Sequence, residues 1–163
     1  MEAKSTDRKN FQISENGQLM AELIYADWLY QKAKIKISNS GEYDLAPVGF
    51  LDSRIAIKKD GNEIASVEMN WKGQMVITFQ DGKEYKLRLN GIFQNKYILE
   101  NEEKEALIEL NAKFHWRNFH HSYDISYDVA EREIPNGDLL LALSVYATNY
   151  FIATMSGANA GVM

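Results

Sequence analysis

The sequence predicts a mostly β fold: an antiparallel barrel of about twelve strands that encloses a hydrophobic helix near the C-terminal end. Three observations lead to this prediction. Apolar and polar residues alternate along many short segments, Asn-Gly and Asp-Gly pairs separate several of these segments, and one long apolar run follows them. Alternation places apolar side chains on one face of a strand, and the turn pairs tolerate the positive φ that tight hairpins require.

Composition limits the classes of function. The 163 residues are 45% hydrophobic and 25% charged, which is typical of one globular domain. The net charge of −5 disfavours nucleic acid as a partner, because that binding depends on neutralising phosphates. Without cysteine there are no disulfides, thiolate zinc sites or cysteine nucleophiles. Since no apolar segment follows the charged first ten residues, we expect no signal peptide and a cytoplasmic protein.

A unit of about four strands occurs three times, beginning at Phe11, Ile55 and Tyr97. Each unit has a short strand, a turn, a longer strand that ends at a tryptophan, a polar strand and a strand that contains tyrosine. The three tryptophans of the chain fall at corresponding places: Trp28, Trp71 and Trp116. The alternative is that any series of short strands looks self-similar. Three such units exceed what a flat sheet holds comfortably, so we expect the sheet to curl and close.

One segment of the first unit, residues 19–30, also fits a helix, because its apolar residues are spaced for one helical face. The repeat aligns it with the range 63–71, where Ile64 and Val67 favour a strand. We therefore expect a strand here as well.

The domain boundaries follow from these patterns. We expect a flexible N-terminus at 1–10, a single barrel domain at 11–157, a core helix at about 138–156 and a tail at 158–163. Asp138 is the expected N-cap and Gly157 the residue just beyond the helix.

The apolar run has a second interpretation. A helix of this length spans roughly 27 Å and is long enough to cross a bilayer, so a tail anchor is the alternative to a core helix. Polar residues such as Ser144, Thr148 and Asn149 weaken the membrane interpretation, and no basic residue follows Arg132. The apolar faces of the strands also need an apolar element to pack against, which favours a core helix.

Three segments carry a resemblance to a known family: Ile55–Val67, Tyr123–Tyr127 and Asp138–Val145. Over about residues 11–156 the chain resembles the tubby C-terminal-like superfamily, which includes the LURP-one-related proteins and the phospholipid scramblases. The resemblance implies a twelve-stranded barrel around a hydrophobic C-terminal helix, in a bacterial-type member of unknown function. Scramblase activity is not expected, because the chain lacks a cysteine cluster and an Asp-rich loop with calcium-ligand spacing.

The resemblance also implies a candidate ligand site, since tubby proteins bind phosphoinositide headgroups through basic residues on the barrel. The candidates here are lysines of the first two units: Lys32, Lys34, Lys36, Lys58, Lys59 and Lys72. The alternative is that these lysines serve only solubility and the protection of strand edges.

All three histidines of the chain, His115, His120 and His121, lie within seven residues and suggest a metal site. On one extended strand, however, His115 and His121 would be roughly 20 Å apart, with His120 on the opposite face. A hairpin turn near Asn118 would be needed to bring them together. We therefore predict no metal ligands.

No catalytic residues are predicted either. Asp124 and Asp128 would lie roughly 13 Å apart on one strand face, too far for a glycosidase pair. Phosphate-binding loops, nucleophile elbows and the zinc-protease motif are absent from the sequence.

These observations favour a non-enzymatic binding or interaction module with an unknown ligand and no cofactor. The alternative is a membrane-surface module that recognises anionic lipid headgroups through the barrel lysines. A third hypothesis is a metal-dependent enzyme built around His115–Asp124. The expected partner is a protein or a peripheral membrane surface, and not nucleic acid.

Overall fold

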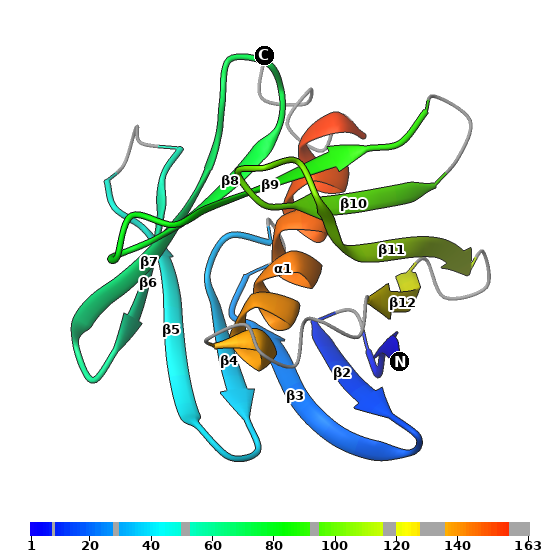
Figure 1. The fold of residues 1–163 in the computed structure, drawn as a ribbon. Coiled ribbons are helices and arrows are strands. Elements are labelled where there is room, and N and C mark those ends of the chain that lie inside the picture. The colour runs from blue at the N-terminus through cyan, green and yellow to red at the C-terminus, as the bar shows by residue number, and fades with distance from the viewer. Residues whose placement is uncertain are drawn as a thin grey trace.

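The computed structural model describes residues 1–7, 9–27, 30–49, 53–91, 95–115, 120–127 and 136–156. Within these ranges twelve strands form one closed antiparallel barrel, and one helix runs through it (Figure 1). The elements are β1 (Glu2–Ser5), β2 (Asn10–Glu15), β3 (Gln18–Tyr25), β4 (Ala33–Ile37), β5 (Gly41–Pro47), β6 (Ile55–Lys59), β7 (Asn62–Met69), β8 (Met75–Phe79), β9 (Glu84–Leu89), β10 (Lys96–Glu100), β11 (Ala106–His115), β12 (His120–Tyr127) and α1 (Gly137–Met155). The predicted fold class is confirmed.

The barrel closes through the N-terminal strand, so the expectation of a flexible segment at 1–10 is wrong. Glu2–Ser5 form β1, which pairs with β2 on one side and β12 on the other. Ala3 lies opposite both Ile13 and Tyr123 and is fully buried. A closed sheet has no free edge, and β1 fills the gap that would otherwise leave two edges exposed.

The three repeated units have a common irregularity. The second strand of each unit carries one extra residue opposite the first strand, which makes a β-bulge. The three extra residues are Met20, Ile64 and Leu107. Bulges increase local twist and curvature, so their recurrence supports the equivalence of the units and helps the sheet to close.

The third unit differs from its prediction. We expected a polar strand as far as His120 and then a separate strand with tyrosine, but a single strand, β12, spans His120–Tyr127. The third unit therefore supplies three strands, and β1 occupies the fourth position. The segment 19–30 does begin with a strand, β3, as the repeat predicted.

Trp71 does not end the longer strand of its unit as expected. Trp71 lies in the turn after β7, which ends at Met69, and its side chain is 90% exposed. Trp28 and Trp116 lie outside the described residues. Trp71 is thus a surface residue and not part of the core that the repeat builds.

Helix α1 fills the barrel, which confirms the core helix. Eleven consecutive residues, Leu139–Asn149, are buried. By length and composition α1 could also cross a membrane, but two thirds of that span (67%) is buried inside the barrel. The N-cap residue is Asn136, in the left-handed region at φ 63°, and not Asp138, which lies in the first turn. A carboxylate there is favoured by the positive end of the helix dipole. Gly157 lies outside the described residues.

Polar groups on α1 fix its orientation in the barrel. The Asn149 carboxamide accepts a hydrogen bond from the Tyr123 hydroxyl (2.5 Å) and donates one to the Tyr25 hydroxyl (3.0 Å). The Tyr146 hydroxyl donates to the backbone carbonyl of Gln31. Because an unpaired buried polar group is costly, these contacts select one rotation and one height for the helix.

The two ends of the barrel can be named by the helix. At the N-cap end, where α1 begins, lie the β2–β3, β4–β5, β6–β7, β8–β9 and β10–β11 turns. At the C-cap end, where α1 finishes, lie the connections β3–β4, β5–β6, β7–β8, β9–β10 and β11–β12. Figure 1 shows the β7–β8 connection rising at the top of the view, on the same side as the red end of α1.

Candidate functional site

The six candidate lysines do not form one basic face. Lys34 forms ion pairs with Glu42 and Asp44, and Lys36 pairs with Glu42, across the outer faces of β4 and β5. The hydrogen bond and charge of Glu42 raise the pKa of Lys34, and Lys34 lowers the pKa of Glu42 in return. Acidic neighbours therefore balance these two lysines, which gives them the solubility role of paired surface charges.

The other candidates lie in three different places. Lys59 is at the N-cap end, where it donates to the Ser40 carbonyl and lies 5.3 Å from the centre of the Tyr43 ring. Lys58 is exposed on β6, opposite Asp44 in register. Lys32 precedes β4 and Lys72 follows β7, both at the C-cap end but on different connections.

A basic groove lies instead on the outer faces of β8, β9 and β10. Its cavity has a volume of about 390 Å³ and is lined by Lys72, Gln74, Lys86, Arg88, Glu100 and Lys104, among others. Arg88 donates to Glu100 across the strands at 3.1 Å. In the part of the chain that the structure describes, Lys72, Lys86 and Lys104 enter no ion pair. We refer to these residues as the basic groove.

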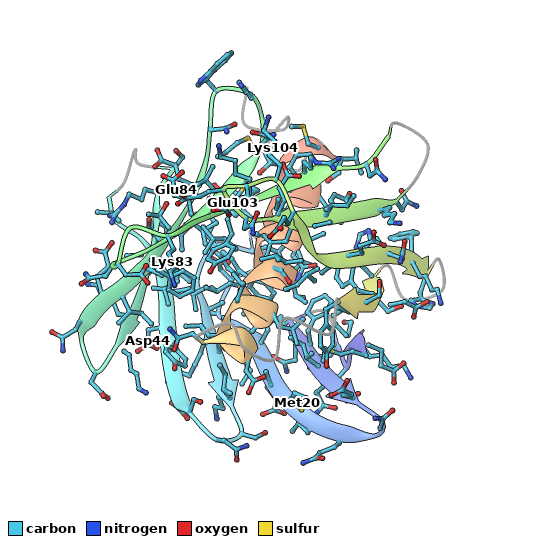
Figure 2. All side chains as sticks on the ribbon, in the orientation of Figure 1. Met20, Asp44, Lys83, Glu84, Glu103 and Lys104 are labelled. Carbon is cyan, nitrogen blue, oxygen red and sulfur yellow. The ribbon has the colours of Figure 1, made fainter. Side chains whose placement is uncertain are left out.

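The β10–β11 turn holds Lys104 at one end of the groove. Lys104 adopts a left-handed φ of 65°, and its N–H donates to the Asn101 carbonyl. The turn reaches over the start of β9, where the Glu84 N–H donates to the Glu102 carboxylate (Figure 2). These bonds fix the position of the turn beside β9.

At the other end of the groove, the β7–β8 turn presents Trp71 on an ordered backbone. The Asn70 carboxamide oxygen accepts hydrogen bonds from the N–H groups of Lys72 and Gln74, and its nitrogen donates to the Gln74 side chain. Gly73 takes the positive φ of 76° that the turn requires. The Lys72 ammonium lies 5.3 Å from the Trp71 ring centre. Hydrogen bonds within the turn thus fix the backbone that carries the exposed indole.

Exposed apolar side chains gather at the C-cap end. Five large hydrophobic residues are exposed in the described ranges, and four of them lie there: Val48, Trp71, Leu89 and Met155. The fifth, Leu19, is near the β2–β3 turn at the opposite end. Scattered single apolar residues are normal on a protein surface, but a tryptophan exposed to this extent beside a basic groove indicates a contact surface.

The histidines lie on two paired strands, β11 and β12, and not on the single extended strand considered from the sequence. β11 and β12 pair so that His115 lies opposite His120, and Phe114 opposite His121. The hairpin places His121 on the face of Phe114, with the ring centres 5.0 Å apart, and His115 on the outer face. No group of three potential metal ligands occurs among the described residues.

The outer face of this hairpin forms a polar cavity of about 360 Å³. The His115 Nε2 and Ser122 Oγ atoms are 2.7 Å apart, and Lys113 pairs with Asp124. A Ser–His contact is one part of a nucleophilic site, but catalysis also requires preorganised donors for the developing oxyanion. Here the contact lies on an exposed strand surface. Asp128 lies outside the described residues.

Among the groove residues, only Lys72 was a candidate from the sequence. Strand register alone does not separate the two kinds of lysine, because Lys34 lies opposite Ile24 and Asp44, and Lys86 lies opposite Val76 and Glu100. The difference is that Glu42 and Asp44 pair with Lys34, whereas Glu100 pairs with Arg88. Side-chain pairing across the strands therefore decides which lysines lack an ion-pair partner.

Comparisons with protein-family models, with curated proteins and with solved structures gave no match for this chain.

Proposed function

We propose that this protein is a non-enzymatic binding module that docks onto an anionic lipid surface through the basic groove and the β7–β8 turn. The observation that carries the proposal is Trp71, exposed on an ordered turn next to lysines that lack ion-pair partners. An indole with one apolar body and one polar N–H is suited to the boundary between water and lipid.

Charge supports the same surface. The protein carries a net charge of −5, so a general attraction to anionic lipid is not expected. The basic groove departs locally from that average, because the basic side chains of Lys72, Lys86, Arg88 and Lys104 outnumber the carboxylates of Glu100 and Glu102 that also line it. Lysines near an anionic membrane contribute about 1 kcal/mol each, which is enough for weak reversible binding when several act together.

We also infer membership of the tubby C-terminal-like superfamily and a cytoplasmic, membrane-peripheral location. The closed barrel of antiparallel strands around a C-terminal helix supports the family proposal. The lipid-facing residues proposed here share only Lys72 with the candidates that the resemblance suggested.

Vesicle sedimentation tests the proposal. The protein should sediment with phosphatidylcholine vesicles that contain phosphatidylserine and not with phosphatidylcholine alone. Binding should decline as salt rises, since the Debye length shortens from about 10 Å at 0.1 M to about 3 Å at 1 M. Lys86→Gln with Lys104→Gln should weaken binding about 30-fold, because each lysine contributes about 1 kcal/mol.

The matched control is Lys34→Gln with Lys36→Gln, which changes the net charge equally but removes lysines that already have acidic partners. The control should bind within about twofold of the unaltered protein. Equal losses in both double variants would mean that overall charge governs binding. Absence of sedimentation at any salt concentration would exclude the lipid surface.

A further inference from the structure

A larger cavity lies at the N-cap end of the barrel, on the side away from Trp71. Its volume is about 630 Å³. The floor includes Met20, Ile37 and Leu140, and the mouth is polar, with the carboxylates of Glu15 and Asp138. Figure 2 shows Met20 on β3, near the beginning of α1. Neither the fold nor the proposed lipid surface requires this opening.

The cavity lies where α1 begins. Helix α1 begins at Gly137, and its first intrahelical backbone bond runs from the Leu140 N–H to the Asn136 carbonyl. Residues of its first turn line the cavity. Met20, the bulge residue of the first unit, lines it from β3. Its unbranched side chain can adapt to ligands of different shape.

Size and composition indicate an organic ligand. Ligand cavities typically have volumes of about 300–1,000 Å³, and this cavity falls within that range. Its lining combines apolar side chains with many polar ones, so a ligand that has both an apolar and a charged part would fit it best. A metal ion would need several converging ligands, and no such group of three occurs among the described residues.

The charge at the mouth favours a cation. Glu15 is held by the Tyr127 hydroxyl, which donates to it at 2.7 Å, and Asp138 lies in the first turn of α1. These two formal negative charges oppose the helix N-terminus, which is equivalent to only about half a positive charge. Met1 also lines the cavity, and its amino group would offset at most one of the two.

We propose that this cavity binds a small organic ammonium ion with an alkyl chain. The ammonium group pairs with Glu15 and Asp138, and the chain lies against Met20, Ile37 and Leu140. The proposal is independent of the lipid surface, because the two sites lie at different places on the barrel and carry opposite charge.

Isothermal titration of the full chain with n-hexylammonium tests this site, with n-hexanol and hexanoate as probes of the same length. Hexylammonium should bind at least about tenfold more tightly than either, because only the ammonium group can donate charge-assisted hydrogen bonds to the two carboxylates. Amide resonances of residues 15–20 and 136–141 should shift in the NMR spectrum. Glu15→Gln and Asp138→Asn should each weaken hexylammonium binding about tenfold.

Two further variants keep the result interpretable. Glu103→Gln removes the same charge from an exposed turn outside the cavity and should leave binding unchanged. Asn39→Trp places a bulky side chain at the mouth, from an exposed turn position, and should block binding while the melting temperature is retained. Equal binding of hexylammonium and hexanol would overturn the proposal, as would an equal loss in Glu103→Gln and Glu15→Gln.

Discussion

The interior around α1 and the surface of the β7–β8 turn use aromatic residues in opposite ways. Inside the barrel, Tyr25, Tyr123 and Tyr146 are buried, and each hydroxyl has a hydrogen-bond partner. On the β7–β8 turn, Trp71 is 90% exposed, and its ring contacts the side chain of Lys72. The interior tyrosines fill a cavity that the strands create, whereas the tryptophan extends beyond the barrel.

This difference distinguishes aromatic residues that stabilise the fold from Trp71, which we propose contacts lipid. A buried aromatic residue is explained by the free energy of folding, because each such side chain removes a large apolar area from water. Trp71 contributes little in this way. We therefore expect changes inside the barrel to alter the free energy of unfolding, and a change at Trp71 to alter only binding.

The largest effect on stability is expected from removal of α1. A chain truncated before Leu139 should be insoluble or unfolded, because the four leucines from Leu139 to Leu143 alone contribute about 6–12 kcal/mol, comparable to the whole stability of a typical domain. Solubility and circular dichroism measure this. A chain that ends at Ser156 keeps α1 and is the control. A soluble, folded truncation would instead favour the tail-anchor interpretation.

Alkaline pH is expected to have the next largest effect. Burial raises the pKa of Tyr25, Tyr123 and Tyr146 well above the ordinary value of about 10. Their stabilisation is complete below about pH 10. It is lost as pH rises further, because the unfolded chain releases three protons that the folded chain retains. The slope is about −1.4 kcal/mol per pH unit for each tyrosine, or about −4 for all three.

Urea unfolding between pH 9 and 12 measures this slope, which reaches its full value above about pH 11, where the unfolded tyrosines are ionised. Tyr123→Phe should reduce it by about a third, since one titrating group is lost. Lysines titrate in the same range, and the comparison with the variant isolates the tyrosine. An unchanged slope in Tyr123→Phe would contradict the burial of this hydroxyl.

A smaller effect is expected at Asn149. Asn149→Leu keeps the branched side-chain shape but leaves the hydroxyls of Tyr25 and Tyr123 without the partner that orients them. The free energy of unfolding should fall by about 2–6 kcal/mol, because each of the two unsatisfied buried groups costs about 1–3 kcal/mol. The triple variant Asn149→Leu, Tyr25→Phe, Tyr123→Phe should recover most of this loss in urea unfolding. No recovery would indicate that packing, and not the hydrogen bonds, accounts for the effect.

Much of the interior could be predicted from the sequence, because hydrophobic periodicity determines which face of each strand is buried. Ala33, Ile35 and Ile37 alternate with polar residues and are buried as expected. The run after Leu139 is apolar on all sides, and the barrel surrounds it. In both cases the local pattern contains the information, since burial depends on the side chains themselves.

The N-terminal strand could not be predicted in this way. Glu2–Ser5 is short and polar, and only Ala3 is buried. Its strand conformation depends on pairing with β12, which is distant in the sequence, as well as with the neighbouring β2, and no local pattern records the need for β12. The sequence pattern predicted four strands in the third unit as well, so the place that β1 fills in the barrel was not visible from the sequence.

The candidate site was predicted less well than the fold. The candidates from the sequence included Lys34 and Lys36, whose charges are balanced by the carboxylate of Glu42 on the neighbouring strand. Compensation depends on which charged side chains pair across neighbouring strands, and this is a tertiary property. The exposure of Trp71 could not be predicted either, because tryptophan is more often buried than exposed.

The most direct test of the account is Trp71→Ala, measured for both stability and vesicle binding. The free energy of unfolding should change by less than about 0.5 kcal/mol, since the side chain is exposed. Affinity for phosphatidylserine-containing vesicles should fall by at least about tenfold, because the indole buries roughly 100 Å² of apolar area at the lipid boundary. Leu19→Ala, an exposed apolar residue at the N-cap end, should change neither quantity. Unchanged vesicle affinity in Trp71→Ala would contradict the proposed docking surface.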